Sequence, residues 1–137
     1  MKSPDCLEAV FAEPPIKRLD ALNRGLPSSV FPGLARQLNL SSAGLPTVLG
    51  LSERTLRSRT TTPRSRLTGD EAERAFRAFR VFKRAKEVLG DEDAARAWLA
   101  TPQRALANRA PLALLTRDVG ADEVLNVLGA IGEGVYL

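Results

Sequence analysis

The residues best suited to chemistry in this sequence are arginines and hydroxyl residues gathered in one short stretch, residues 52–66. Five of the chain's 20 basic residues lie there beside a single acid, Glu53, whereas the rest of the chain holds fifteen basic and fifteen acidic residues. The whole net charge of +4 therefore lies in this stretch. Such a concentration of guanidinium groups is typical of a surface that contacts nucleic-acid phosphates. We predict these DNA-contacting residues: Ser52, Arg54, Thr55, Arg57, Ser58, Arg59, Arg64 and Arg66. A solvated arginine-rich loop is the alternative.

Enzymatic chemistry has little support in this composition. The sequence contains no histidine, and Cys6 is its only cysteine. A Cys–His nucleophilic pair, a Ser-His-Asp triad and an ordinary zinc site are therefore all missing. No glycine-rich phosphate loop follows a strand pattern. We predict that the protein is not an enzyme and that it uses neither a metal nor a cofactor.

A short helix is predicted directly before the arginine-rich stretch. Leu45, Val48 and Leu49 follow an i, i+3, i+4 pattern, which makes one apolar helical face. Gly50 can end this helix, because glycine adopts a left-handed backbone conformation without steric cost. Pro46 is tolerated only in a first turn, so the helix must begin at about Leu45.

A second helix would carry the arginines. Ser52 is a suitable N-cap, and the helix is predicted from Glu53 to about Arg59, with Leu56 pointing inward. Two short amphipathic helices joined by such a tight turn form a helix-turn-helix, here at about residues 43–60. The second helix of this motif enters the major groove of DNA. An ordinary helical hairpin with a solvated basic face is the alternative.

The residues before this motif predict an arm and two more helices. Residues 1–15 contain three prolines and are expected to form a loosely held arm. Residues 16–24 form a candidate helix closed by Gly25. The apolar stripe over residues 31–38 predicts another helix, with Pro32 in its first turn.

The residues after the motif predict one long helix. Thr68 and Glu71 fit a capping box, and a stripe of alanines and phenylalanines extends over residues 69–89. Gly90 follows this stripe and ends the helix. We expect the phenylalanines to lie in the core.

Three shorter elements are predicted beyond it. Asp91 is the N-cap of the next helix, and Pro111 opens a short one. A break is expected at Gly120, followed by a last helix over residues 121–132. No stretch shows sustained strand alternation.

The fold class is therefore predicted to be all-α. An N-terminal arm and helix-turn-helix, residues 1–66, would be joined by the long helix to a C-terminal helical region, residues 67–137. No apolar run approaches the roughly 20 residues that span a bilayer, and the N-terminus lacks the apolar core of a secretory signal. We expect a cytoplasmic protein with no membrane partner.

A homodimer is predicted on two grounds. The apolar stripes at residues 69–89 and 121–132 exceed what a chain of 137 residues easily buries alone. In addition, a palindromic operator is read by a two-fold symmetric protein.

The C-terminal half contains three features in a fixed order: Trp98-Leu99, Pro111-Leu112 and a terminal spacing from Ile131 to Gly134-Val135. This order of residues resembles that of a known family, the Xre/MbcA/ParS-like antitoxins, and the resemblance covers roughly residues 35–137. Pro46 departs from the family pattern, in which a small helix-forming residue is usual.

This resemblance implies a role in a RES–Xre type II toxin–antitoxin system. The partner would be a RES-domain toxin, which depletes cellular NAD and is encoded by the adjacent gene. The antitoxin would bind the toxin, obstruct its active site and also bind the operator of its own operon. A dimeric helix-turn-helix regulator without a toxin partner is the alternative, and the identity of the neighbouring gene distinguishes the two.

The predicted toxin-binding surface lies in the last helices and the apolar end of the chain. An apolar ending after two glycines can fold back on its own core or enter a partner's cleft, and the resemblance favours the partner. The predicted contact residues are Trp98, Pro111, Leu112, Val124, Leu128, Ile131, Val135, Tyr136 and Leu137.

Overall fold

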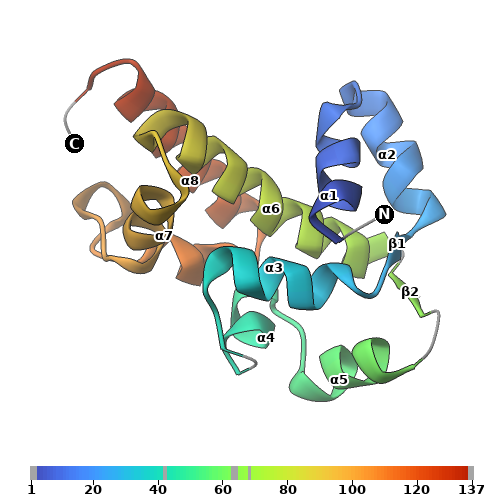
Figure 1. Ribbon diagram of the computed structural model, residues 1–137. Coiled ribbons are helices and arrows are strands. Elements are labelled where there is room, and N and C mark those ends of the chain that lie inside the picture. The colour runs from blue at the N-terminus through green and yellow to red at the C-terminus, as the bar shows by residue number, and fades with distance from the viewer. Residues whose placement is uncertain (1–2, 42, 63–64, 68, 136–137) are drawn as a thin grey trace. The chain divides into compact units, whose positions relative to one another are not determined.

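The computed structural model describes residues 3–41, 43–62, 65–67 and 69–135, and these are predominantly helical (Figure 1). They form two compact units, Met1–Phe76 and Arg77–Leu137, which share the long helix α6 (Gly69–Leu89). The all-α prediction is confirmed. The division at residue 66 that we propose on functional grounds lies before this structural boundary. None of the described helices is long and apolar enough to cross a membrane.

A short antiparallel ladder was not predicted. Strand β1 (Leu26–Pro27) pairs with β2 (Arg66–Leu67), with Leu26 opposite Leu67. Two-residue strands are too short to show an alternating pattern in the sequence. The ladder joins the segment after the second helix to the segment that leads into α6.

The N-terminal segment is a packed helix, so the prediction of a loosely held arm is wrong. Helix α1 (Ser3–Ala12) lies antiparallel to α2 (Pro15–Arg24) and also contacts α3 (Val30–Leu38) (Figure 1). Leu7 and Val10 are buried in this contact region. The prolines do not prevent the helix; Pro14 and Pro15 instead separate it from α2, where Pro15 is the first residue.

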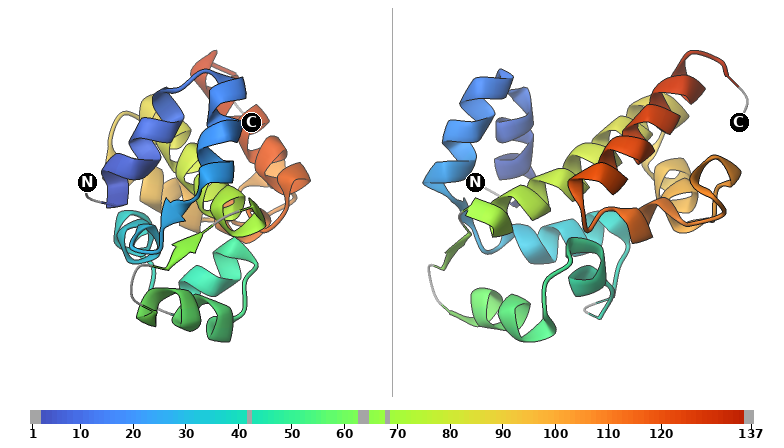
Figure 2. Two further views of the ribbon diagram at one scale, coloured as in Figure 1. Left: turned by 90° about the vertical axis from the view of Figure 1, so that its right-hand side faces the viewer. Right: turned by 180° about the vertical axis from the view of Figure 1, so that it is seen from behind.

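The helix-turn-helix forms as predicted. Helix α4 (Gly44–Leu49) ends at Gly50, which has a left-handed φ of 69°, and α5 (Glu53–Thr61) follows. Pro46 is buried in the first turn of α4, where its missing N–H leaves no helical hydrogen bond unmade. Figure 2 shows α3, α4 and α5 grouped together, with α5 outermost.

Helix α6 has the predicted bounds, and its apolar stripe is buried. Phe76 is buried in the N-terminal unit, and Phe79 and Phe82 are buried in the C-terminal unit. In the stripe of the last helix, Val124, Val127 and Leu128 are buried, whereas Ile131 is half-buried. The expectation that these stripes exceed what the chain buries alone is therefore wrong for all but Ile131, because the other residues are covered within the chain itself.

The C-terminal unit contains the remaining elements. Its helices are α7 (Glu92–Ala100) and α8 (Asp118–Gly132), separated by the 3₁₀ turns η1 (Arg104–Leu106) and η2 (Pro111–Leu114). The side chain of Asp91 caps α7 by accepting a 2.7 Å hydrogen bond from the N–H of Ala94, as predicted. Helix α8 runs beside the C-terminal half of α6 (Figure 2), and Gly132 faces Val88 there.

The predicted break at Gly120 is wrong, because α8 begins earlier, at Asp118. Arg77 pairs with Asp118 at 2.6 Å and donates to the carbonyl oxygens of Leu115 and Thr116, which holds the turn before the helix in place. Gly120 occupies the first turn of α8, where its lack of a side chain permits a close contact with Leu114.

Candidate functional site

The N-terminal end of α5 is capped by its own hydroxyl residues. The Oγ of Ser52 accepts a 3.0 Å hydrogen bond from the N–H of Thr55 and donates a 2.9 Å bond to the Oγ1 of the same residue. Both predicted DNA contacts therefore also stabilise the start of the helix. Ser52 remains exposed and Thr55 is half-buried.

The outer face of α5 carries two arginines that make no ion pair or side-chain hydrogen bond with the described residues, Arg54 and Arg57. Successive residues of an α-helix are rotated by about 100°, so Arg54 and Ser58 lie on the face opposite the buried Leu56. Arg54, Arg57 and Ser58 are exposed. Arg54 and Ser58 on this face, together with Arg57 at its edge, can present two guanidinium groups and a hydroxyl to a polyanion.

The other predicted arginines are placed differently. The Nε of Arg59 donates to both carboxylate oxygens of Glu71, at 3.0 and 3.1 Å. Arg66 donates a 2.7 Å hydrogen bond to the carbonyl oxygen of Gly25 beside the β-ladder. Both groups thus have partners inside the N-terminal unit. Arg64 lies outside the described residues.

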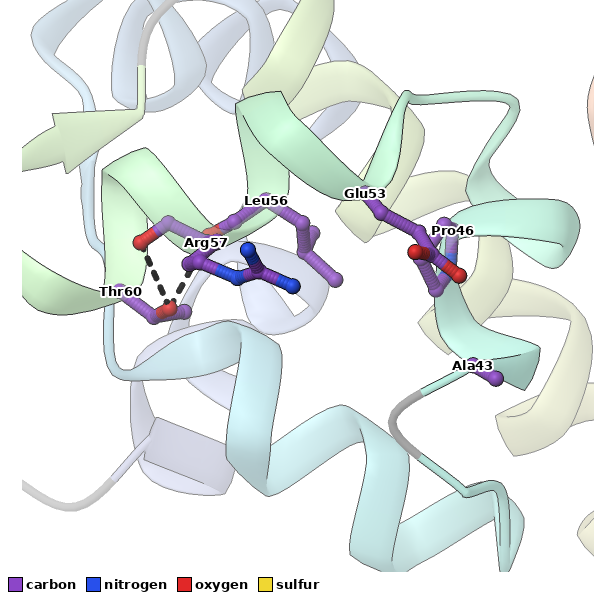
Figure 3. A pocket seen from close by; sticks show the side chains of 6 residues that line it. All are labelled: Ala43, Pro46, Glu53, Leu56, Arg57 and Thr60. Carbon is purple, nitrogen blue, oxygen red and sulfur yellow. Dashed lines mark hydrogen bonds between the residues drawn. The ribbon is translucent and has the colours of Figure 1, made fainter.

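A groove of about 460 Å³ opens between α4 and α5 (Figure 3). Leu56 and Arg57 extend from α5 on one side of it, and Pro46 and Ala43 lie on the other. Thr60 closes its end and donates to the carbonyl oxygens of Leu56 and Arg57. Ala43 was not predicted as a site residue, although it lies at the start of the predicted helix-turn-helix, because its side chain carries no group that could mark it.

A smaller groove of about 220 Å³ lies at the end of α8. It is lined by Gln103, Arg104, Ala105, Val127, Ile131, Gly134 and Val135. Of the predicted toxin contacts, Ile131 and Val135 are thus brought together at one opening. The segment at Gln103–Ala105 was not predicted, since only the fold brings it to α8.

The backbone fixes Val135 at the rim of this groove. Gly134 has a left-handed φ of 82°, and the N–H of Val135 donates a 2.9 Å hydrogen bond to the carbonyl oxygen of Ala130. The Val135 side chain is nevertheless 47% exposed. Tyr136 and Leu137 lie outside the described residues.

The other predicted toxin contacts divide by burial. Val124 and Leu128 are fully buried, and Pro111 is buried as well, so these three belong to the core of the C-terminal unit. We therefore remove these three residues from the predicted toxin contacts. Val124 and Leu128 belong to the stripe of α8 that faces the chain's own core, and Pro111 is buried at the start of η2. Trp98 and Leu112 are half-buried and keep part of their surface accessible.

A third hollow, of about 440 Å³, lies between η1, η2 and the start of α8. Leu106, Leu114 and Arg117 line it, together with Val119, which is 74% exposed. In the sequence, Val119 is an apolar residue that falls outside the apolar stripe of α8. This position could have marked it as an apolar residue on the surface.

Comparisons with known proteins match both halves of the chain. Residues 17–80 match the antitoxin Xre-like helix-turn-helix domain, and residues 84–134 match the antitoxin Xre/MbcA/ParS C-terminal toxin-binding domain. The similarity therefore begins earlier than the residue 35 expected from the sequence.

Full-length relatives and a solved structure agree with these matches. The chain is 30% identical over 119 residues to the Antitoxin Xre of Yersinia enterocolitica, covering 86% of this chain and 80% of the relative. It is 30% identical over 115 residues to the Antitoxin Xre of Photorhabdus laumondii, covering 83% and 77%. A chain of the crystal structure of the M. tuberculosis MbcT–MbcA toxin–antitoxin complex superposes with a TM-score of 0.59 at 26% identity, covering 80% of this chain and 96% of that one. This chain therefore belongs to the Xre family of antitoxins.

Proposed function

We propose that this protein is the antitoxin of a RES-domain toxin encoded by the adjacent gene, and that it prevents NAD depletion by obstructing the toxin's active site. The observation that carries the proposal is the groove of about 220 Å³ around Ile131 and Val135, which lies at the end of the segment similar to a toxin-binding domain. Blocking a cleft requires shape, apolar contact and a few polar anchors, and no catalytic residue. In this proposal the protein acts by binding the toxin and not as an enzyme.

Among the described residues, the proposed contacts are those that keep apolar surface accessible, with Ile131 and Val135 at the centre of the groove. Tyr136 and Leu137, which lie outside the described residues, are proposed to enter the toxin's cleft. Tyr136 is the preferred anchor, because an aromatic ring buries a large area while its hydroxyl keeps a hydrogen bond. Trp98 and Leu112 would flank this surface.

Two variants co-expressed with the toxin test the proposal. Deletion of residues 135–137 should give growth arrest and NAD loss, although the deletion also removes the hydrogen bond from Val135 to Ala130. Tyr136→Ala avoids that loss, and we expect it to weaken toxin binding by about 2 kcal/mol, or roughly 30-fold in Kd. Circular dichroism must show that both remain folded. Full rescue by the deletion variant would place inhibition elsewhere, for example around Trp98 and Leu112.

We also propose that the protein binds the operator of its own operon through α5. The supporting observation is the outer face of this helix, where Arg54 and Arg57 are exposed and have no ion-pair partner among the described residues. A homodimer is the proposed DNA-binding form, because a palindromic operator requires two-fold symmetry. Light scattering at micromolar concentration should give twice the mass of the chain, and a strictly monomeric mass would contradict the dimer.

A further inference from the structure

The ion pair between α5 and α6 differs from the other charged groups of the helix-turn-helix. The side chain of Arg59 is 42% exposed, whereas that of Glu71 is only 18% exposed. The Nε of Arg59 donates to both carboxylate oxygens of Glu71, and charge-assisted hydrogen bonds of this kind are stronger than neutral ones. The carboxylate is thus held within the fold, and the guanidinium group is drawn towards it.

The position of Arg59 on α5 explains this contact. Arg59 follows the buried Leu56 by three residues, so the two lie on neighbouring parts of one helix face. Arg54 and Ser58 lie on the opposite face. Arg54 and Arg57 of α5 are therefore exposed, whereas Arg59 is directed towards Glu71 of α6.

The same turn of α6 also holds the other helix of the motif. Arg74 donates to the carbonyl oxygens of Leu49 and Gly50, at 2.8 and 3.2 Å, and pairs with Asp70 at 2.6 Å. These carbonyls lie at the C-terminal end of α4, where a cation is electrostatically favoured. Within the N-terminal unit, α6 thus contacts α4 through Arg74 and α5 through Glu71.

We propose that Arg59 is a positioning residue and not a DNA contact, and that Glu71 orients the recognition helix through it. Together with Arg74, the pair fixes the angle between α4 and α5, and with it the direction in which Arg54 and Arg57 project. This inference rests on the proposed DNA binding and deepens it. It removes Arg59 from the predicted phosphate contacts and adds Glu71, an acidic residue, to those on which DNA affinity depends.

The experiment measures Kd for a DNA duplex carrying the region upstream of the protein's own reading frame, at a series of salt concentrations. We expect Arg59→Gln and Glu71→Gln each to weaken binding about tenfold while leaving the slope of log K against log salt unchanged. The matched control, Arg57→Gln, should lower that slope by about 0.9, because it removes a phosphate contact. Loss of the negative charge of Glu71 would by itself favour DNA binding, so weaker binding by Glu71→Gln cannot be an effect of net charge.

Charge reversal and hydrogen exchange separate positioning from a loss of folding. The double variant Arg59→Glu with Glu71→Arg should recover most of the DNA affinity that either single change removes. Without DNA, amide hydrogen exchange in α5 should be faster in both single variants and return towards the wild-type rate in the double variant.

Three results would overturn the proposal. They are a lowered salt slope for Arg59→Gln, unchanged or tighter binding by Glu71→Gln, and unchanged amide exchange in α5 of the single variants. If the wild-type protein does not bind the duplex, the proposed DNA-binding function fails instead, and the exchange rates still decide whether the pair positions α5.

Discussion

Gly120 in α8 and Leu114 in η2 approach so closely that a Cβ atom at Gly120 would lie 2.0 Å from the carbonyl oxygen of Leu114. It would also lie 2.9 Å from the carbonyl carbon of the same residue. Both neighbours are backbone atoms, which cannot move aside as a flexible side chain can. Only glycine allows the chain to turn from η2 into α8 at this separation.

We therefore expect Gly120→Ala to lower the free energy of unfolding by about 3 kcal/mol, the upper end of the range for overpacking. Gly129→Ala is the matched control, because it lies in the same helix and its Cβ would have no neighbour within 4 Å. That substitution should be neutral or stabilise the protein by up to about 1 kcal/mol through helix propensity. Urea denaturation measures both, and equal stability of the two variants would contradict the close contact.

The capping role of Ser52 can be separated from its place at the DNA surface. Aspartate and asparagine both cap helices well, so Ser52→Asp and Ser52→Asn should retain the wild-type unfolding free energy to within about 0.5 kcal/mol. Only aspartate adds a negative charge, which repels phosphates. Electrophoretic mobility shifts should therefore show weaker operator binding for Ser52→Asp alone, and equal binding by both variants would remove the start of α5 from the interface.

The two outward arginines should act on DNA affinity through phosphates. Arg54→Gln and Arg57→Gln should each lower the slope of log K against log salt by about 0.9 and weaken binding to all sequences alike. Arg80 is a matched control, because it is exposed in the C-terminal unit. A slope that falls equally for Arg80→Gln would show a general charge effect and no specific surface.

Helix α8 offers a paired test of the toxin-binding surface. Ile131→Asp puts a charge into the groove beside Val135, and we expect it to weaken toxin binding by about 2 kcal/mol. Val119→Asp puts the same charge at a 74% exposed site at the other end of the helix and should leave binding unchanged. Titration calorimetry with the toxin measures both. The reverse result would move the contact to the hollow between η1, η2 and Val119.

Local features of this protein could be predicted from the sequence, because their causes lie within a few residues of each other. The bounds of α6 follow from its apolar period, and Ser52 and Asp91 cap their helices through hydrogen bonds to residues three positions later. The left-handed Gly50 ends α4 for a similarly local reason. The resemblance of the C-terminal half to a family of antitoxins was also present in the order of residues.

Other features were decided by residues far away in the sequence. Helical periodicity places Leu128 and Ile131 on one side of α8, but only packing decides that Leu128 is covered completely and that Ile131 lines an open groove. It likewise cannot show that Arg59 meets Glu71 while Arg54 stays exposed, because the partner belongs to another helix. The sequence by itself determined the caps, the strongly periodic helices and the helix face on which each of their residues lies, but not helix α1 or the β1–β2 ladder. Tertiary structure decided what covers each face, because burial and ion pairing depend on contacts that a local pattern does not contain.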